Sequence, residues 1–386
     1  MTNHASSQLV SPATFLISSR AAELKAEGHP VLSLSIGEPD FPTPAHIKEA
    51  AKAAIDGDVS HYTPTGGLPV LKQAVIDKYK REYNIEYAMN EVVCGAGGKQ
   101  MLFNFFEVVL EPGDEVALTD PAWLSYEQQI KWTGAIPLRV PTTPESNFTM
   151  TAAALAAVIT ANTKVVLINS PGNPTGGIIP KEELEGIIEL CEKHDLIILS
   201  DDVYEFFYYD DEPANVLKMR ADLKERVLVI NSVSKTYAMT GWRLGFSVGP
   251  ADIIKKMQQR QSLSTSNPCS IAQMAAVEAL NGPQDEVEMM RVAFASRRDL
   301  AVKKLVEHGR IPFVRPTGAF YLLMDIRHLL NEGETDLEFC KRLLEKHYLA
   351  LIPGSVFGEA TRGWIRLSIA SNEAVIAEAL ERLFSL

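Results

Sequence analysis

Apolar and polar residues alternate with two different periods along the middle of the chain. Between residues 91 and 281, short runs rich in Val, Ile and Leu are separated by longer segments with the spacing of amphipathic helices. The predicted strands are 92–96, 115–119, 136–140, 164–169, 196–200, 227–231 and 244–248. The predicted helices are 98–110, 123–133, 151–160, 181–194, 251–260 and 270–281. This alternation indicates an α/β fold with a largely parallel sheet covered on both faces.

The two ends of the chain have a different pattern. The N-terminal part predicts a helix at 13–27, a strand at 31–36, a stiff proline-rich arm at 37–44 and helices at 45–56 and 68–83. The C-terminal part predicts helices at 285–308, 336–346 and from Asn372, and strands at 312–315, 319–325, 348–352 and 363–369. We therefore predict a large domain over residues 45–285 and a smaller α+β domain formed by residues 1–44 and 286–386.

Residues capable of chemistry follow several of the predicted strands. In open α/β sheets, ligands bind beyond the carboxyl ends of the strands. The segments that follow the strands are 95–100, 120–123, 170–176, 201–204 and 231–246. Because these ends meet at one edge of the sheet, we expect the segments to share a site.

The 231–246 segment places Lys235 between two apolar strands. Ser232, Ser234 and Thr236 flank this lysine, and Arg243 follows eight residues later. An amine among hydroxyl groups and near an arginine suits attack on an aldehyde while the neighbours hold a phosphate. These are the requirements of a Schiff-base lysine with pyridoxal phosphate. A surface loop with a solvated lysine is the alternative.

The glycine-rich segment at 95–100 fits no complete nucleotide motif. A dinucleotide fingerprint needs a third glycine, and a phosphate loop needs Ser or Thr after Gly-Lys, but both positions are Gln100. Small residues at Gly97 and Gly98 still allow backbone N–H groups at a helix N-terminus to approach a phosphate. A tight strand–helix turn is the alternative.

Three further positions allow both a structural and a functional interpretation. Asp201 ends an apolar strand, where a carboxylate needs a cation or hydrogen-bond donors, or serves as a helix cap. Trp123 is either a core aromatic or a stacking surface for a planar ring. Arg366 lies within a strand and binds either a ligand carboxylate or an internal one.

Composition excludes several classes of function. With a net charge of −12 and a pI near 5.3, the chain lacks the basic surface that nucleic acids require. No apolar run reaches the roughly 20 residues of a membrane helix, and no Cys/His cluster predicts a metal site. The N-terminus shows no secretory signal, and the four cysteines are widely spaced, so we expect reduced thiols in a cytoplasmic protein.

Several motifs in this order resemble the class I aminotransferases. They are Gly-Glu-Pro-Asp-Phe at 37–41, Ser-Pro-Gly-Asn-Pro-Thr-Gly at 170–176, Ser-Asp-Asp-Val-Tyr-Glu at 200–205, the stretch from Ser232 to Gly245 and Arg-Leu-Ser at 366–368. The resemblance covers nearly the whole chain and is greatest to the prokaryotic aspartate aminotransferases and their relatives. It implies the type I fold of pyridoxal-phosphate enzymes, with a mostly parallel seven-stranded sheet and a smaller α+β domain.

The resemblance also implies roles for individual residues. Lys235 would form the Schiff base and act as the general base, and Asp201 would pair with the pyridine nitrogen. Asn173 and Tyr204 would bond the phenolic oxygen, and Trp123 would stack on the ring. The phosphate group would be surrounded by Gly97, Gly98, Lys99, Ser232 and Arg243. Arg366 would bind the substrate α-carboxylate beside Gly37, with Trp123 and Asn173 also lining the substrate pocket.

The resemblance further implies a homodimer with shared active sites. Tyr62 would reach the phosphate of the neighbouring subunit, and Ser266 is a second candidate for this role. The reaction would move an amino group between an L-amino acid and a 2-oxo acid by a ping-pong mechanism. A β-lyase reaction on the same cofactor and a non-catalytic binding protein are the alternatives, although intact Lys235 and Asp201 count against the latter.

Two departures from the family pattern concern the substrate side chain. The arginine that reads a side-chain carboxylate in animal-type aspartate aminotransferases is replaced here by Ser262. The lysine that many prokaryotic relatives place before a Pro-Ser-Ala-Thr run is replaced by Val10. These departures suggest the hypothesis of a neutral or aromatic amino donor, with glutamate and 2-oxoglutarate still possible as co-substrates.

Overall fold

A seven-stranded sheet forms the centre of the computed structural model, which describes residues 13–386. Its strands, in spatial order, are β2 (Val92–Gly95), β8 (Gly245–Val248), β7 (Val227–Ser232), β6 (Ile197–Asp201), β5 (Thr163–Ile168), β3 (Glu115–Asp120) and β4 (Ile136–Pro141). β8 runs antiparallel to both its neighbours, and the other pairs are parallel. The predicted α/β fold with a mostly parallel seven-stranded sheet is therefore confirmed.

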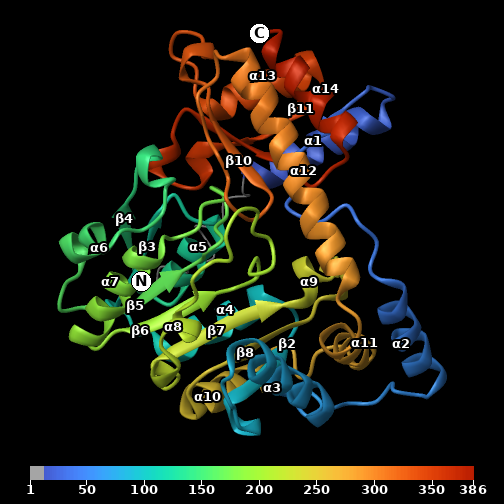
Figure 1. The fold of residues 1–386 in the computed structure, drawn as a ribbon, viewed down its shortest axis with the longest axis vertical. Coiled ribbons are helices and arrows are strands. Elements are labelled where there is room, and N and C mark those ends of the chain that lie inside the picture. The colour runs from blue at the N-terminus through green and yellow to red at the C-terminus, as the bar shows by residue number, and fades with distance from the viewer. Residues whose placement is uncertain (1–12) are drawn as a thin grey trace, which may run out of the picture.

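Helices cover both faces of this sheet (Figure 1). One face packs against α4 (Gly98–Val109), α5 (Leu124–Trp132) and α10 (Ala251–Ser262). The other packs against α2 (Ala45–Asp56), α3 (Pro69–Tyr83), α6 (Ala152–Val158), α7 (Lys181–Lys193), α8 (Val216–Met219) and α11 (Ser270–Asn281). Because both faces are buried, the strands read as nearly continuous apolar runs rather than alternating ones.

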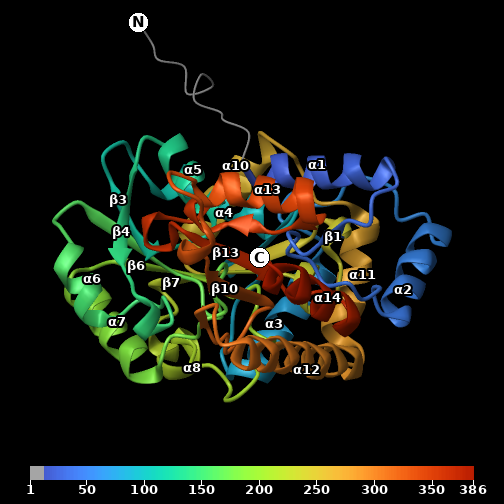
Figure 2. The ribbon, with the colours of Figure 1, turned by 90° about the horizontal axis from the view of Figure 1, so that it is seen from above.

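A second group of elements combines the two ends of the described chain. Its antiparallel sheet has the order β12 (Ile352–Pro353), β13 (Trp364–Ser368), β10 (Tyr321–Asp325) and β9 (Phe313–Val314). β1 (Leu32–Ser33) pairs in parallel with β11 (Leu349–Ala350). The helices of this group are α1 (Ala13–Ala26), α12 (Asp285–His308), α13 (Asp336–His347) and α14 (Glu373–Phe384). A separate apolar core holds them together. Seen from above, β10, β13 and α14 lie over the middle of the molecule (Figure 2).

Short elements are where the predicted and observed structures differ. The strand predicted at 31–36 is reduced to the two residues of β1, and the one predicted at 348–352 is divided into β11 and β12. The division occurs because the chain passes from the two-stranded to the four-stranded sheet at Leu351. The one-turn helices α8 and α9 (Val233–Thr236) were not predicted, since four residues are too few to show a helical period.

Candidate active site

A cavity of about 490 Å³ opens at the carboxyl ends of the central strands and is closed on one side by the second group of elements. Most of the residues singled out in the sequence line it: Gly37, Gly98, Lys99, Trp123, Asn173, Asp201, Tyr204, Ser232, Lys235, Arg243 and Arg366. Gly97 lies at its edge, beside Arg243. Tyr62 and Ser266 do not line it, and the Tyr62 side chain is 94% exposed.

Lys235 reaches the cavity from α9, the one-turn helix that directly follows β7. Ser232 caps this helix by accepting a hydrogen bond from the Ser234 N–H at 3.0 Å. The Lys235 ammonium donates to the carbonyl oxygen of Gly37. Burial lowers the pKa of Lys235 from 10.5 to about 8, although Glu38 partly opposes this change. A substantial fraction of the amine is therefore neutral, and nucleophilic, near physiological pH.

Asp201 is buried at the end of β6, where its negative charge is poorly solvated. Tyr126 on α5 donates its hydroxyl to the Asp201 carboxylate, and the Val203 N–H donates at 3.4 Å. Burial nevertheless raises the pKa of Asp201 from 3.8 to about 6, because these donors only partly replace water. A cationic partner would keep this carboxylate ionised, so the site is suited to bind a protonated nitrogen.

Cationic and N–H groups without carboxylate partners gather where α4 begins. Gly97 precedes the helix with φ at +91°, and a Cβ atom there would lie 2.6 Å from the Arg243 guanidinium. Arg243 donates to the Thr240 carbonyl at 2.8 Å and, among the described residues, has no carboxylate partner. The N-terminus of α4 has no side-chain cap, so its first N–H groups are free to bind an anion.

Lys99, in the first turn of α4, extends over the indole of Trp123, with its nitrogen 4.9 Å from the ring centre. Burial, and to a smaller extent Arg243, lower the pKa of Lys99. No carboxylate of residues 13–386 pairs with this lysine. Lys99 is therefore available to a ligand anion in the cavity.

Arg366 lies on β13, at the opposite wall. Its terminal nitrogens donate to the Asn173 side-chain oxygen at 2.9 Å and to the Ser35 carbonyl at 2.7 Å, while Nε has no partner. The guanidinium lies over the ring of Tyr321, 4.4 Å from its centre. The described residues offer it no carboxylate, so the internal salt bridge considered for this arginine is not formed. A ligand carboxylate would supply the missing partner.

Tyr126, Tyr321 and Asn169 were not predicted from the sequence but contribute to the site. The hydroxyl groups of Tyr321 and Tyr204 are hydrogen-bonded at 2.8 Å, and a Cβ atom on Gly37 would collide with Tyr321. Asn169 accepts from the Asn173 N–H at 3.0 Å and donates to the Asp201 carbonyl at 2.9 Å. Tyr126 lies in the first turn of α5, the helix that Trp123 precedes.

Comparisons with known proteins agree with this arrangement. A family model described as aminotransferase class I and II matches residues 29–383. The chain belongs to this family. It is 44% identical to an aspartate aminotransferase of Bacillus sp. (strain YM-2), with 96% of this chain and 95% of that protein covered. It is 39% identical to an aspartate/prephenate aminotransferase of Thermus thermophilus, with 96% and 94% covered.

A solved structure extends the likeness to three dimensions. The aspartate aminotransferase from Thermus thermophilus with maleate superposes with a TM-score of 0.94 at 38% identity, covering 100% of this chain and 99% of that one. The chain is thus a pyridoxal-phosphate-dependent aminotransferase that transfers an amino group between an amino acid and a 2-oxo acid. The predicted family, enzyme class and cofactor are confirmed.

The residues of the cavity fit this cofactor. Its dianionic phosphate matches the uncapped start of α4 with Arg243, and its aldehyde matches the partly neutral Lys235. Its pyridine nitrogen, when protonated, matches the buried Asp201. When bound, pyridoxal phosphate supplies an electron sink for the carbanion formed at the substrate Cα.

Other predictions concern features outside the cavity. No helix within residues 13–386 is long and apolar enough to cross a membrane. Over the same range, no cluster of His, Cys, Asp and Glu could hold a metal ion. Ser262 is exposed and donates to the Gln259 carbonyl at 2.7 Å, away from the cavity. Val10 lies outside the described residues.

Proposed function

We propose that this aminotransferase uses Lys235 as its Schiff-base lysine and proton carrier, and that the residue roles implied by the resemblance apply to this chain, except that of Lys99. The partly neutral amine of Lys235 supports this role, because it can take the proton from the substrate Cα near neutral pH. Asp201 holds the pyridine nitrogen protonated, and Asn173 and Tyr204 bind the phenolic oxygen. Trp123 covers the ring, while Gly97, Gly98, Ser232 and Arg243 hold the phosphate.

We further propose that the amino donor is a dicarboxylic amino acid, aspartate in particular. The observation that carries this proposal is the presence of two unpaired cations in the cavity beyond those needed for the phosphate. Arg366 binds the α-carboxylate, and Lys99 binds the side-chain carboxylate. Lys99 was also a candidate for the phosphate, but its place over Trp123 puts it against the ring-stacking wall. The names of the relatives support aspartate, and the Thermus structure contains maleate, a dicarboxylate.

A neutral or aromatic donor is the second candidate. It rests on the absence of the usual arginine at Ser262 and of the usual lysine at Val10. The names of several relatives pair aspartate with prephenate, which indicates that cavities of this kind also accept bulkier substrates. The relatives reported above give no support to a β-lyase reaction.

The kcat/KM values for aspartate, alanine and phenylalanine distinguish the two candidates. We expect aspartate to be preferred, and Lys99→Met to remove about 2–3 kcal/mol of that preference, as expected for a desolvated charge pair. Lys303→Met, which alters an exposed lysine, is the control. A wild-type preference for alanine or phenylalanine would favour the second candidate.

We propose a homodimer because of the position of Tyr62. This tyrosine is 94% exposed and lies outside the cavity of its own chain, as does Leu263, which is 83% exposed. In the proposed dimer, Tyr62 reaches the phosphate of the partner subunit. Mixing a Tyr62→Ala variant with a Lys235→Ala variant should then restore activity, because some hybrid dimers contain one intact site. If no mixture exceeds the parents, the sites are not shared.

The division into domains at 45–285 and at 1–44 with 286–386 is also a proposal. It is supported by the pairing of β1 with β11 and by the separate apolar cores of the two parts. A cytoplasmic location is proposed because the four cysteines are free, three of them buried. Cell fractionation would test the location, and limited proteolysis near residue 285 would test the division.

A further inference from the structure

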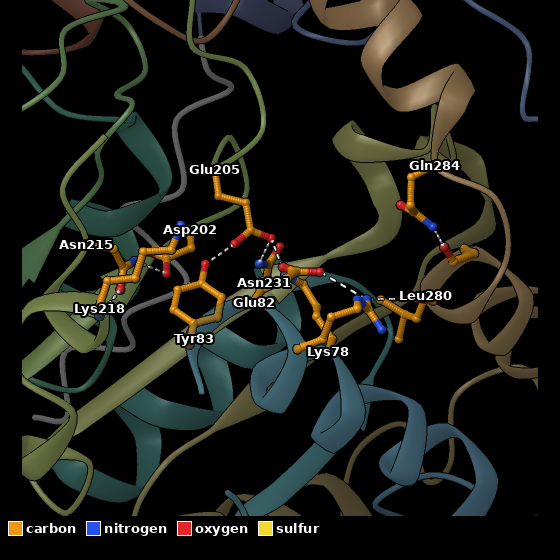
Figure 3. Close-up of polar contacts among 12 residues, drawn as sticks. Lys78, Glu82, Tyr83, Asp202, Glu205, Asn215, Lys218, Asn231, Leu280 and Gln284 are labelled. Carbon is orange, nitrogen blue, oxygen red and sulfur yellow. Dashed lines mark hydrogen bonds and ion pairs between the residues drawn. The ribbon is translucent and has the colours of Figure 1, made fainter. Parts of the chain in front are cut away.

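Adjacent residues at the ends of β6 and β7 face opposite sides of the large sheet. Asp201 and Ser232 line the active-site cavity. Side chains of a strand alternate between its two faces, and their neighbours Asp202 and Asn231 contact residues from the other side. Both are buried, at 3% and 2% exposure. Polar groups so deeply buried require partners, and here two hydrogen-bonded groups, one around Asp202 and one around Glu205, form a network joined by the bond from the Glu205 N–H to the Asp202 carbonyl (Figure 3).

Asn231 is the point at which this network meets the active site. Its carboxamide donates to a Glu205 carboxylate oxygen at 2.7 Å and accepts from the Ser232 N–H at 2.7 Å. A carboxylate can only accept, so it holds the NH₂ group of Asn231 and leaves the amide oxygen for Ser232. The charge of Glu205 therefore determines which way the Asn231 amide is turned.

Glu205 is itself held by buried donors from α3. The ammonium of Lys78 lies 2.9 Å from it, and the hydroxyl of Tyr83 donates to its second oxygen. The Lys78 side chain is 2% exposed and also contacts Glu82. Burial opposes the charge of Lys78, but the two carboxylates outweigh it and raise the Lys78 pKa. Figure 3 shows Lys78, Glu82, Tyr83 and Asn231 gathered around Glu205.

Glu205 also belongs to the loop that carries Asp201 and Tyr204. Glu205 directly follows Tyr204, and its N–H donates to the Asp202 carbonyl at 3.0 Å. Asp202 in turn accepts from Ser200 and from Asn215. Glu205 thus joins the loop that carries Asp201 and Tyr204 to the strand end that carries Ser232 and α9. Both loops must contact one rigid, planar cofactor.

We propose that Glu205 and Asn231 are positioning residues that hold Ser232 and the Lys235 helix in register with the Asp201 loop. Ser232 caps α9, so an Asn231 amide that orients Ser232 also orients the turn from which Lys235 extends. The network is separated from the substrate-binding Arg366, and it acts on the cofactor end of the cavity. This inference rests on the proposed assignment of Ser232 and Lys235 to the cofactor site.

A reciprocal exchange of the two side chains tests the proposal. Asn231→Asp alone sets two carboxylates against each other, and Glu205→Gln alone removes the charge that orients the amide. We expect each to raise the dissociation constant of pyridoxal phosphate for the apo-protein about tenfold or more. In the double variant, the amide of the introduced glutamine donates to the introduced aspartate, which still accepts from the Ser232 N–H. The same amide replaces the carboxylate oxygen that Lys78 contacts, so binding should recover in part, to a value clearly better than that of the weaker single variant.

Two further readouts separate positioning from a general loss of structure. At saturating cofactor, the KM for the amino donor should remain unchanged, because Arg366 is untouched. Glu82→Gln removes a carboxylate that contacts Lys78 but not Asn231, so this control should bind the cofactor like the wild type. If Glu205→Gln fails to fold, Asn231→Ala is the alternative variant. It leaves the charged residues Lys78, Glu82 and Glu205 in place and should show the same weaker binding of pyridoxal phosphate.

The proposal would be overturned by wild-type cofactor binding in both single variants, or by a double variant no better than the weaker single one. An equal loss in Glu82→Gln would also overturn it, since a general electrostatic effect would then explain the change. If the wild-type protein bound no pyridoxal phosphate, the site assignment would fail first and this inference with it. Normal wild-type binding with unaffected variants would refute the inference alone.

Discussion

Two lysines on opposite sides of the same strand ends, Lys235 partly buried and Lys78 fully buried, have opposite electrostatic surroundings. Lys235 faces the active-site cavity, and burial lowers its pKa to about 8. Lys78 faces the other side, where Glu205 and Glu82 raise its pKa in spite of burial. Burial alone destabilises a charged amine, so the direction of each change shows whether nearby carboxylates outweigh burial: Glu38 does not do so for Lys235, whereas Glu205 and Glu82 do so for Lys78. The fold pairs Lys78 with carboxylates and leaves Lys235, the proposed Schiff-base lysine, without a salt bridge among the described residues.

The comparison extends to the other charges on each side. Around the cavity, Lys99, Arg243 and Arg366 lack carboxylate partners within the described chain, and Asp201 is buried with only neutral donors. Asp201 and Arg366 are buried, so their unpaired charges are costly for the empty protein, whereas Lys99 and Arg243 are exposed and cost little. Binding of the cofactor and substrate would offset that cost. The difference between the two sides therefore predicts which substitutions affect activity and which affect stability.

Replacing the two lysines should give the largest contrast. We expect Lys235→Ala to reduce kcat by about 10²–10⁴-fold or more, because 10²–10⁴ is the range for loss of a general acid–base group. The same variant should lose little stability as the apo-protein. Lys78→Met should destabilise the protein by about 3 kcal/mol, because it removes the cation paired with Glu205, whose side chain is 10% exposed, and one of the two cations paired with Glu82. Steady-state kinetics and denaturant unfolding measure the two effects. Appreciable turnover by Lys235→Ala would exclude its assigned role.

Arg366→Ala should have the next largest effect, on substrate binding. We expect KM to rise about 30-fold or more for every amino acid, because each uses the α-carboxylate. Arg342→Ala is a suitable control, since Arg342 is an arginine of the second group that is already paired with Glu334. The control should alter stability but not KM. Unchanged KM values in Arg366→Ala would contradict the carboxylate-binding role.

Most of the large sheet, and the side of it where the site lies, could be predicted from the sequence. Buried parallel strands produce apolar runs long enough to recognise, and polar residues that follow such runs meet at one edge of the sheet. Asp201, Asn173 and the segment around Lys235 satisfied this rule and line one cavity. The one-turn helix that presents Lys235 was not predictable, because its conformation depends on the Ser232 cap and on packing rather than on periodicity.

The residues that sequence reasoning missed act through partners far away along the chain. Tyr321 lies in a predicted apolar strand, and its function depends on Tyr204, 117 positions earlier. Glu205 and Asn231 fell within segments singled out in the sequence, but no role was predicted for them, since their significance comes from Lys78 on another element. A single sequence shows residue types and their spacing, but it does not show which buried polar groups become hydrogen-bond partners.

Asp201→Asn and Asp202→Asn should both change the pH dependence of stability, one on each side of the sheet. Burial raises the pKa of Asp201 to about 6 and that of Asp202 to about 7, from an ordinary 3.8. The folded apo-protein then binds more protons than the unfolded chain, so these groups reduce stability as pH rises from about 4 to 7. Each asparagine should stabilise the apo-protein by about 1–3 kcal/mol at pH 7.5 and have little effect at pH 4.

The cofactor distinguishes these two otherwise similar substitutions. Asp201→Asn should also weaken pyridoxal phosphate binding and reduce kcat, whereas Asp202→Asn should leave kcat nearly unchanged, because its side chain faces away from the cavity. Denaturant unfolding at several pH values, together with cofactor titration, measures both effects. A pH-independent stability difference would show that the ionised form of Asp201 is not destabilised by burial.

Tyr126→Phe should have the smallest effect and refine the description of the cavity side. The Tyr126 hydroxyl is a neutral donor to Asp201 and lowers its pKa, opposing the effect of burial. Removing it should raise the Asp201 pKa further and weaken cofactor binding by about threefold to tenfold, the net value of one typical intramolecular hydrogen bond. Because a protonated Asp201 cannot hold a pyridinium, the loss should be larger at pH 6 than at pH 8.5.

Tyr79→Phe is the matched control, since the Tyr79 hydroxyl is buried without a partner on the other side of the sheet. An equal, pH-independent loss in both variants would mean that Tyr126 acts through packing alone.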